Sequence, residues 1–251
     1  MDIFLDDQLL KDALRRAWTI WPDRFGANAS TLRRMLKTFP GSASVSNFRP
    51  TAARNIIGGF SRDGATVLDF SAGYGGRLLG ALSLDRHYVG IDPCAQQIEG
   101  LRRSLDLLGT LVSLREAARL IHGCAEDVMQ GIPSQSIDLV FSSPPYFDWE
   151  KYSQEPTQSY LRYPTYRKWI EGFMQPTIEE SYRVLRRKGR LALNLSGGLR
   201  RPSPVEVHSV ASRVGFRLEH SGTLRLARVP YMHPRSVGPS KLEEFLVWSK
   251  P

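Results

Sequence analysis

The chain has 251 residues, of which 41% are hydrophobic and 24% charged, and its formal net charge is +9. This length and apolar content are sufficient for one substantial core, and no run of about 18 apolar residues predicts a membrane span. Residues 1–7 are acidic and lack the basic segment of a signal peptide, so we expect a cytoplasmic protein without membrane contact.

The N-terminal part of the chain is predicted to be helical. Residues 5–21 carry apolar side chains at helical spacing, and a proline follows as a stop signal. Ser30 can cap a second helix, which Pro40-Gly41 would close. We expect residues 1–45 to form a helical extension that serves as a packing element. Contact with nucleic acid through its basic side chains is the alternative.

A glycine-rich turn follows the first predicted strand. The apolar residues 65–70 run into the sequence SAGYGG at 71–76, and a helical pattern comes next. Strand, glycine turn and helix form the nucleotide-binding opening of a doubly wound sheet, because missing side chains let the backbone approach a ligand. The second strand, residues 87–91, ends in Asp92, 19 residues after Gly73. This spacing is close to the roughly 20 residues expected for a carboxylate that binds ribose hydroxyls.

Strands and helices alternate along the rest of the chain, which is typical of a mostly parallel sheet. The third strand is expected to end at Glu126-Asp127, and the fifth to begin after a turn at Lys188-Gly189. The last two strands form a hairpin. The later strands are expected at residues 121–125, 137–140, 190–195, 216–226 and 242–248. We therefore assign residues 46–251 to one α/β domain, with a small basic loop insertion at 227–240.

A turn with two prolines follows the fourth strand, in the sequence Phe141-Ser142-Ser143-Pro144-Pro145-Tyr146. Each proline fixes its own φ, contributes no N–H donor, and restricts the preceding residue to extended geometry. Such a turn can hold acceptors around an amino group while the aromatic ring stacks on whatever carries the amine. A rigid turn without chemistry is the alternative for these residues taken alone.

The positive charge is concentrated late in the chain. Residues 183–235 contain eleven arginines and Lys188 against only Glu206 and Glu219, so this stretch holds the whole net charge. Clustered arginine favours nucleic acid, through phosphate contacts and bidentate contacts to guanine. A solvated face is the alternative. The expected nucleic-acid contacts are Arg200, Arg201, Arg228, Tyr231 and Arg235.

The glycine turn and the Ser-Pro-Pro-Tyr turn, in that order, together resemble the S-adenosylmethionine-dependent amino-methyltransferases that modify DNA at cytosine N4 or adenine N6. The resemblance covers roughly residues 46–250. It implies a seven-stranded Rossmann-like methyltransferase sheet and S-adenosylmethionine as the cofactor. The serine form of the proline motif is commoner among cytosine-N4 enzymes, so cytosine N4 is expected ahead of adenine N6. Residues 46–51 are similar to the cofactor-lid segment of the family, with an ordinary loop as the alternative.

The resemblance also implies roles for individual residues. The catalytic turn would be Ser143, Pro144, Pro145 and Tyr146, where the Ser143 hydroxyl and the Pro144 carbonyl accept hydrogen bonds from the amine, and Tyr146 stacks on a flipped base. Asp92 would bind the ribose. Asp127, or else Glu126, would lie near the adenine amine. The implied cofactor contacts are Phe48, Thr51, Asp69, Phe70, Ser71, Gly73, Gly75, Asp92, Pro93, Asp127 and Ser142.

Other readings remain open. Pro93-Cys94 resembles the nucleophile of cytosine-C5 methyltransferases, but it follows the second strand instead of the fourth, so we expect Cys94 to pack under the adenosine. Only two cysteines occur, Cys94 and Cys124, and the five histidines lack metal-ligand spacing, so no metal is expected. The alternatives in function are an RNA amino-methyltransferase, a non-catalytic nucleic-acid-binding protein and a small-molecule methyltransferase. A homodimer and a paired restriction enzyme are likewise left open.

Overall fold

The computed structural model describes residues 11, 15, 47–109, 117–148, 152, 155–196, 202–225 and 242–251. The chain divides into two compact units, Met1–Ser46 and Asn47–Pro251. Of the first unit only Lys11 and Arg15 are described, and both are helical. The rest of the expected helical extension lies outside the described residues, and the second unit is described below by itself.

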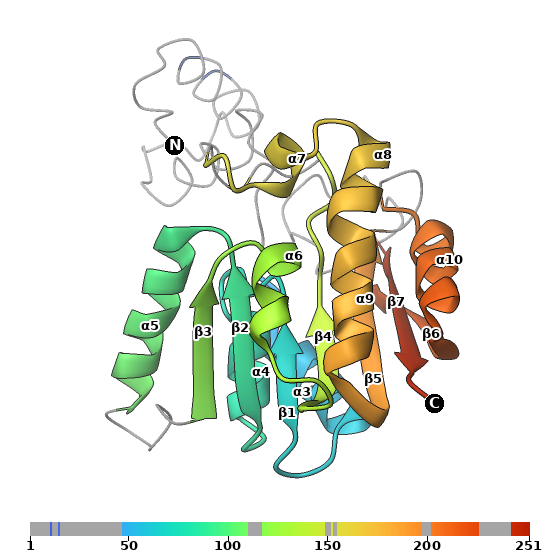
Figure 1. Cartoon of the computed structure of the whole chain (residues 1–251). Helices are drawn as coiled ribbons and strands as arrows, with labels where there is room; N and C mark the ends of the chain where they lie inside the picture. The colour runs from blue at the N-terminus through green and yellow to red at the C-terminus, as the bar shows by residue number, and fades with distance from the viewer. Residues whose placement is uncertain are drawn as a thin grey trace. The chain divides into compact units, whose positions relative to one another are not determined.

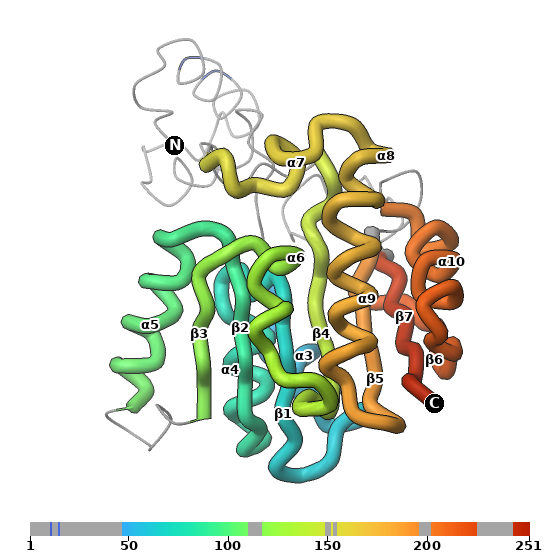
Figure 2. The backbone as a smooth tube through the Cα atoms, viewed as in Figure 1, coloured from blue at the N-terminus to red at the C-terminus, as the bar shows by residue number. Residues whose placement is uncertain are grey.

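A seven-stranded sheet forms the centre of the second unit, with the strand order β3-β2-β1-β4-β5-β7-β6 (Figures 1 and 2). The first five strands run parallel, and β7 is antiparallel to both of its neighbours. The doubly wound, mostly parallel sheet that we expected is thus confirmed. The strands are β1 (Thr66–Asp69), β2 (His87–Asp92), β3 (Ala118–His122), β4 (Ile137–Ser142), β5 (Leu185–Ser196), β6 (Arg217–Arg225) and β7 (Leu242–Ser249).

Helices cover both faces of this sheet (Figure 1). One apolar core joins the strands to α3, α4 and α5, and the other joins them to α6, α9, α10 and the π-helical η4. Among the described residues, no helix is both long and apolar enough to cross a membrane. The helices are α3 (Pro50–Phe60), α4 (Gly76–Leu82), α5 (Ala95–Gly109), α6 (Ala125–Val128), η3 (Met129–Gly131), α7 (Ser159–Arg162), α8 (Tyr166–Trp169), η4 (Ile170–Met174), α9 (Gln175–Val184) and α10 (Pro204–Val214).

Two expected element boundaries were wrong. The third strand ends at His122, and the acids expected at its end, Glu126 and Asp127, lie instead in the first turn of α6. The fifth strand begins earlier than expected, at Leu185. The turn expected at Lys188-Gly189 is a register shift inside this strand, where Lys188 takes a φ of 62°.

One carboxylate joins three elements at the amino edge of the sheet. Asp138 of β4 accepts a hydrogen bond of 2.9 Å from the backbone N–H of Thr66 at the start of β1. The guanidinium groups of Arg186 and Arg62 pair with the same carboxylate. Burial alone would raise the pKa of Asp138, but the hydrogen bonds from Thr66 and Arg186 outweigh burial and lower the pKa.

This lowered pKa gives the fold a predictable pH dependence. Because the carboxylate is favoured in the folded state, it stabilises the fold above the unfolded pKa of about 3.9, and the stabilisation is lost as the pH falls through the folded value. We expect Asp138→Asn to lower the free energy of unfolding by about 1–3 kcal/mol at pH 7, with a smaller loss below about pH 4. Urea unfolding at both pH values measures this. Asp85→Asn, on an exposed turn, is the matched control. An equal loss of unfolding free energy in Asp138→Asn at both pH values would contradict this explanation.

Candidate functional site

Two turns leave the same edge of the sheet from neighbouring strands. β1 pairs in parallel with β4, so the glycine turn after Asp69 and the Ser-Pro-Pro-Tyr turn after Ser142 both emerge at the carboxyl edge. β2 pairs with the other side of β1 and brings Asp92 to that edge. The strand order reverses between β1 and β4. Open α/β sheets bind ligands outside the carboxyl ends of the strands at such a reversal.

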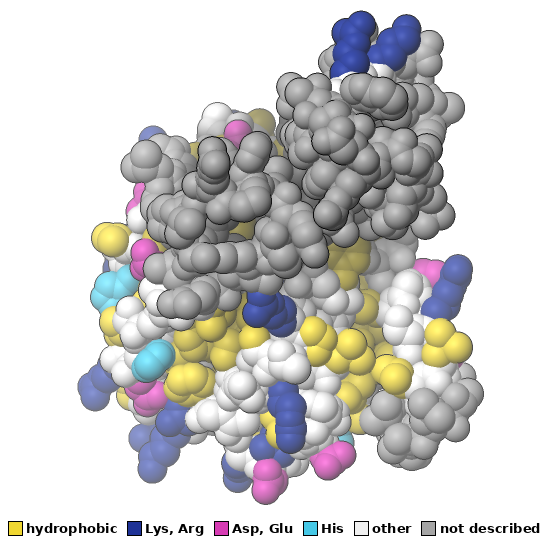
Figure 3. All heavy atoms as spheres, turned by 180° about the vertical axis from the view of Figure 1, so that it is seen from behind, with side chains coloured by type: hydrophobic (Ala, Val, Ile, Leu, Met, Phe, Trp, Pro, Cys, Tyr) yellow, Lys and Arg dark blue, Asp and Glu magenta, His cyan; other side chains and the backbone are white. Residues whose placement is uncertain are grey.

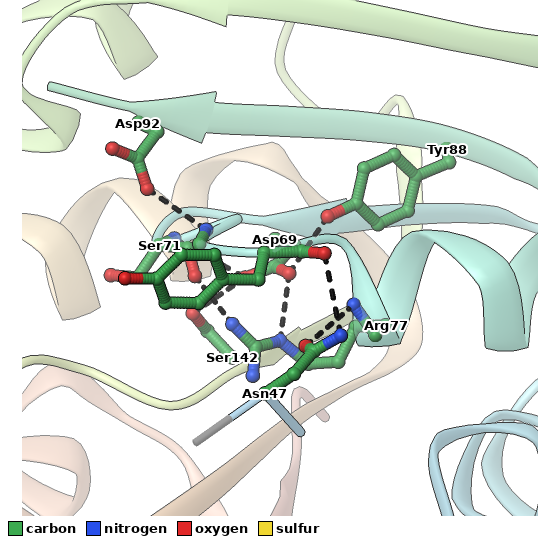
Figure 4. A network of polar contacts seen from close by, with 10 residues as sticks. Asn47, Asp69, Ser71, Arg77, Tyr88, Asp92 and Ser142 are labelled. Atoms are coloured by element: carbon green, nitrogen blue, oxygen red, sulfur yellow. Dashed lines mark hydrogen bonds and ion pairs between the residues drawn. The ribbon is translucent and has the colours of Figure 1, made fainter. Parts of the chain in front are cut away.

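The carboxylate of Asp69 connects these turns (Figure 4). Asp69 is fully buried, and its oxygens accept hydrogen bonds from four groups. Arg77 Nε and the Tyr88 hydroxyl donate to Oδ2, at 2.7 and 2.8 Å. The Ser142 hydroxyl and the Ser71 backbone N–H donate to Oδ1, at 2.8 and 3.2 Å. Since a carboxylate has about four acceptor positions, Asp69 is saturated by the protein. In the structure these side chains of Asp69 and Ser142 hold the two turns together, and their expected cofactor contacts stay a prediction.

Arg77 is the buried cation of this network. Its side chain is 6% exposed, and its guanidinium also donates to the carbonyl of Ser71. Burial alone would lower the pKa of Arg77, but the charge and hydrogen bond of Asp69 outweigh burial and raise it. Burial and the same negative charge hold the pKa of Tyr88 well above its usual value. The tyrosine therefore remains a hydrogen-bond donor, and the arginine remains charged.

The residues before α3 cross over the glycine turn. The N–H of Gly76 donates to Asn47 Oδ1 at 3.1 Å, and Asn47 Nδ2 donates to the carbonyl of Tyr74 at 3.4 Å. A Cβ atom at Gly76 would lie only 1.8 Å from the carbonyl oxygen of Phe48, so a side chain here would displace the crossing segment. The Phe48 ring packs edge-on against Phe141.

Asp92 contacts the glycine turn directly. Gly73 and Gly75 have φ angles of 52° and 82°, which residues with a side chain rarely adopt. The Gly73 N–H donates to Asp92 Oδ2 at 2.9 Å, and the Cys94 N–H donates to Oδ1 at 3.0 Å. Burial raises the pKa of Asp92, although these two hydrogen bonds oppose the rise. Each carboxylate oxygen keeps a further acceptor position for a hydroxyl group.

The Ser-Pro-Pro-Tyr turn is enclosed. The Ser143 hydroxyl is buried and has no hydrogen-bond partner among the residues that the structure describes. Tyr146 is only 6% exposed, and its hydroxyl accepts a hydrogen bond of 3.4 Å from Asn194 Nδ2. A ring this deeply buried presents no open face. Stacking of a base on Tyr146, as expected from the resemblance, thus requires the site to open.

The aromatic residues after this turn have other partners. Phe147 packs edge-on against Tyr166 and Trp169, with ring centroids 5.6 and 6.0 Å apart. The Phe147 ring therefore packs within an aromatic cluster at α8.

The chain from Glu155 onward packs over the ends of β2 and β3. The Thr157 hydroxyl donates to the carbonyl of Pro93 at 3.2 Å, and the Cys124 thiol lies 3.4 Å from the carbonyl of Thr157. The Cys94 thiol contacts Glu155 Oε1 at 3.8 Å. Burial raises the pKa of both thiols. A nucleophilic cysteine needs the opposite shift, so the structure supports the packing role for Cys94.

The acids after β3 are held by Arg162 of α7. Its guanidinium lies 2.8 Å from Asp127 Oδ2 and 2.6 Å from Glu126 Oε1, which also accepts from the Tyr163 hydroxyl at 3.2 Å. The hydrogen bond with Asp127 raises the pKa of Arg162, and burial together with Glu126 raises the pKa of Tyr163 to about 12. Ligand atoms of Cys124, Glu126 and Asp127 lie within 4.8 Å of one another. Because a guanidinium already occupies this cluster, it is an ion-pair cluster and carries no metal assignment.

Two described arginines of the basic stretch 183–235 form ion pairs within the protein. Arg183 pairs with Glu180 at 2.7 Å, and Arg186 pairs with Asp138. Both arginines lie near the amino end of β5, at the opposite edge from the two turns. On the face drawn in Figure 3, the described basic side chains are scattered among hydrophobic and neutral ones. The expected nucleic-acid contacts Arg200, Arg201, Arg228, Tyr231 and Arg235 lie outside the described residues.

The structure therefore gathers most of the expected cofactor residues at one edge. Phe70 is buried in the core beneath the turn, and Thr51 is exposed in the first turn of α3. Three residues of the polar network were not expected from the sequence, namely Asn47, Arg77 and Tyr88. The one sequence feature that could have indicated a buried role for Arg77 is its charge among the apolar residues that begin the predicted helix. The residues gathered near the glycine turn are Phe48, Asp69, Ser71, Gly73, Gly75, Asp92 and Pro93.

No family model matches the sequence, and no curated protein matches it either. Solved structures are similar in fold. A TehB-like SAM-dependent methyltransferase from Corynebacterium glutamicum has a TM-score of 0.52 at 16% identity, over 89% of this chain and 96% of that chain. A methyltransferase from Pyrococcus furiosus has a TM-score of 0.55 at 15% identity, over 96% and 97%.

A third similar structure, described as a candidate RNA methyltransferase from Pyrococcus horikoshii, has a TM-score of 0.51 at 14% identity, over 80% of this chain and 82% of that chain. At these identities the likeness establishes the fold alone. The chain has the Rossmann-like fold found in these methyltransferases.

The buried ion pair predicts a large effect of removing one partner. Arg77→Met would leave Asp69 buried without its cation, which costs about 3–5 kcal/mol for a buried pair. The double variant Asp69→Asn with Arg77→Met should recover part of this loss, since no unpaired charge remains. Urea unfolding measures both. Arg103→Met is the matched control, because its pair with Glu99 is exposed and is worth at most about 0.5 kcal/mol. Equal losses for the two arginines would contradict the account.

Proposed function

We propose that this protein transfers a methyl group from S-adenosylmethionine to an exocyclic amine of a DNA base, with cytosine N4 ahead of adenine N6. The observation that carries the proposal is the shared support of the two turns. Asp69 accepts hydrogen bonds from Ser71 in the glycine turn and from Ser142 beside Ser143. A donor site and an acceptor site would thus be held in one fixed relation. The fold is one that S-adenosylmethionine-dependent methyltransferases use, so this cofactor is the expected one.

The glycine turn fits such a cofactor. Among the described residues, a Cβ atom at Gly73 would meet only the carbonyl oxygen of Ser71, at 3.8 Å, so this part of the backbone leaves room for a ligand. Asp92 offers acceptor positions for the two ribose hydroxyls beside that turn. Gly73, Gly75 and Asp92 would hold the cofactor, which supplies an already activated methyl group.

The chain's own residues would align the amine. An exocyclic amine is a poor nucleophile because its lone pair is delocalised into the base. Acceptors at Ser143 Oγ and at the Pro144 carbonyl would draw the amine hydrogens aside and direct the nitrogen for in-line attack. The two prolines contribute no N–H donors that could compete for these acceptors. The buried, unpartnered hydroxyl of Ser143 among the described residues supports this role.

DNA is proposed as the substrate because of where the remaining basic residues lie in the chain. Residues 197–201 follow the carboxyl end of β5, and residues 226–241 connect the end of β6 with the start of β7. Because β7 is antiparallel to both β5 and β6, the carboxyl ends of β5 and β6 lie at the same edge of the sheet as the two turns. Both segments begin at that edge. They contain Arg200, Arg201, Arg228 and Arg235. A base in a duplex would have to leave the helix to reach an enclosed turn.

RNA is the second candidate. It is supported by the fold likeness to the candidate RNA methyltransferase from Pyrococcus horikoshii. Basic residues serve either nucleic acid, because both present the same phosphate backbone. The two substrates are separated by the assay described next.

Methyl transfer tests the proposal directly. The protein is incubated with labelled cofactor and DNA, RNA or neither, and the modified nucleoside is identified by mass spectrometry. We expect N4-methylcytosine or N6-methyladenine in DNA. Ser143→Ala should lower kcat by about tenfold or more, the value of one lost hydrogen bond, with little change in the Kd of the cofactor. Ser136→Ala is the control, since that hydroxyl bonds to Pro133 before β4. Unchanged activity of Ser143→Ala would remove Ser143 from the mechanism.

Salt dependence tests the nucleic-acid contacts. The double variant Arg228→Gln with Arg235→Gln should bind DNA more weakly and reduce the slope of log K against log salt by about 2, one unit for each lost phosphate contact. Arg217→Gln, an exposed residue at the start of β6, is the control. Fluorescence anisotropy at several salt concentrations gives the slopes. Equal slopes for wild type and double variant would place the DNA contacts elsewhere.

A further inference from the structure

Three buried side-chain atoms lack a hydrogen-bond partner within the described part of the chain. Two of them, Ser143 Oγ and Asn194 Oδ1, lie at the carboxyl edge of the sheet. In the register of β4 and β5, Ser142 pairs with Leu193, so Ser143 directly follows the end of β4 and Asn194 is the next residue of β5. The third, Thr177 Oγ1, lies in α9. A buried polar atom without a partner is unfavourable, and two at one corner indicate that a ligand completes them.

Asn194 is held on both of its sides. It is 2% exposed and lies on β5, which pairs with β4 and with β7. Its Nδ2 donates to Glu243 Oε2 at 2.6 Å and to the hydroxyl of Tyr146 at 3.4 Å. Both hydrogens of the amide are therefore used, and one of them is bound to the tyrosine of the Ser-Pro-Pro-Tyr turn.

Glu243 fixes which way this amide faces. An ionised carboxylate can only accept hydrogen bonds, so the amide must present Nδ2 to Glu243. Turning the amide over would place its carbonyl oxygen against the carboxylate, with two acceptors in contact. The carbonyl oxygen Oδ1 therefore faces away from Glu243 and is left as an acceptor.

We propose that Asn194 Oδ1 is a third acceptor for the substrate amine, beside Ser143 Oγ and the Pro144 carbonyl, and that Glu243 is the positioning residue that sets its orientation. The inference rests on the proposed function and deepens it. An amine has two hydrogens, and Asn194 Oδ1 adds an acceptor of fixed direction to the two that the serine-proline turn offers. A base that carries a carbonyl oxygen in place of the amine would bring an acceptor against Asn194 Oδ1, which can only accept, whereas the Ser143 hydroxyl can donate as well as accept. Asn194 thus selects amine-bearing bases, in contrast to uracil or hypoxanthine.

Glu243→Gln tests this inference because it keeps the shape and changes the hydrogen bonding. A glutamine amide can donate to Asn194 Oδ1, so the Asn194 amide can turn and present its N–H₂ group in place of the carbonyl. The probes are duplexes with the methylated base and with its carbonyl counterpart, uracil for cytosine or hypoxanthine for adenine. Wild type should bind the amine duplex about tenfold more tightly, the value of one hydrogen bond. Glu243→Gln should reduce this ratio to about one or invert it, and should lower kcat/KM to a similar extent.

Two further variants show whether the change in base preference arises from the acceptor or from a general disturbance of the fold. Thr177→Val removes an unpartnered buried hydroxyl away from the site and should leave both the ratio and the activity unchanged. Asn194→Ala removes the acceptor while Glu243 stays, and should also abolish the preference for the amine duplex. Thermal unfolding shows whether each variant folds.

The outcomes separate the inference from the function on which it rests. If wild type methylates DNA but folded Glu243→Gln and Asn194→Ala keep the wild-type ratio, the inference alone is overturned. If wild type binds the amine and carbonyl duplexes equally well, it is overturned in the same way. If wild type transfers no methyl group to any nucleic acid, the proposed function falls and the inference falls with it.

Discussion

The buried pair between Asp69 and Arg77 is the contact on which the geometry of the site depends. Its members come from the end of β1 and the first turn of α4, and the hydrogen bonds of Asp69 extend to Tyr88 on β2 and Ser142 on β4. A buried ion pair adds little stability over apolar residues of the same size, although breaking one is costly. Stability alone therefore does not account for the network. Its structural consequence is that side chains of three strands and the glycine turn share one carboxylate.

This shared support restricts how the two turns can move. A shift of the Ser-Pro-Pro-Tyr turn through Ser142 would disturb the same carboxylate that holds Ser71 in the glycine turn. The proposed methyl transfer would need a fixed relation between donor and acceptor, and a network of this kind would provide it. Tyr146 of the Ser-Pro-Pro-Tyr turn is buried, and the sheet holds Asn194 in place, so the proposed base would enter through a local opening.

Much of this arrangement could be predicted from local patterns. The apolar runs and the glycine turn indicated the parallel sheet, and the spacing of Gly73 and Asp92 corresponds to a hydrogen bond between them. These features depend on a few neighbouring residues, so the sequence displays them. Two motifs at the ends of separate strands also pointed to one edge, because parallel strands share their carboxyl ends.

The polar network could not be predicted in the same way. Arg77, Asn194 and Glu243 lie at unrelated positions, and their partners are set by strand order and register. For the same reason, nothing local shows that Arg162 binds Asp127, or that Arg186 in the basic stretch pairs with Asp138. The third strand was extended too far because Glu126 and Asp127 follow an apolar run, whereas they start a helix of four residues.

The central claim is that the glycine turn and the serine-proline turn face one bound ligand. A crystal structure with S-adenosylhomocysteine and a DNA duplex tests it most directly. The account predicts the ribose on Asp92, the homocysteine part along Gly73 and Gly75, and the sulfur facing Ser143 and Pro144. A nucleoside bound elsewhere, or one whose sulfur faces away from the serine-proline turn, would contradict it.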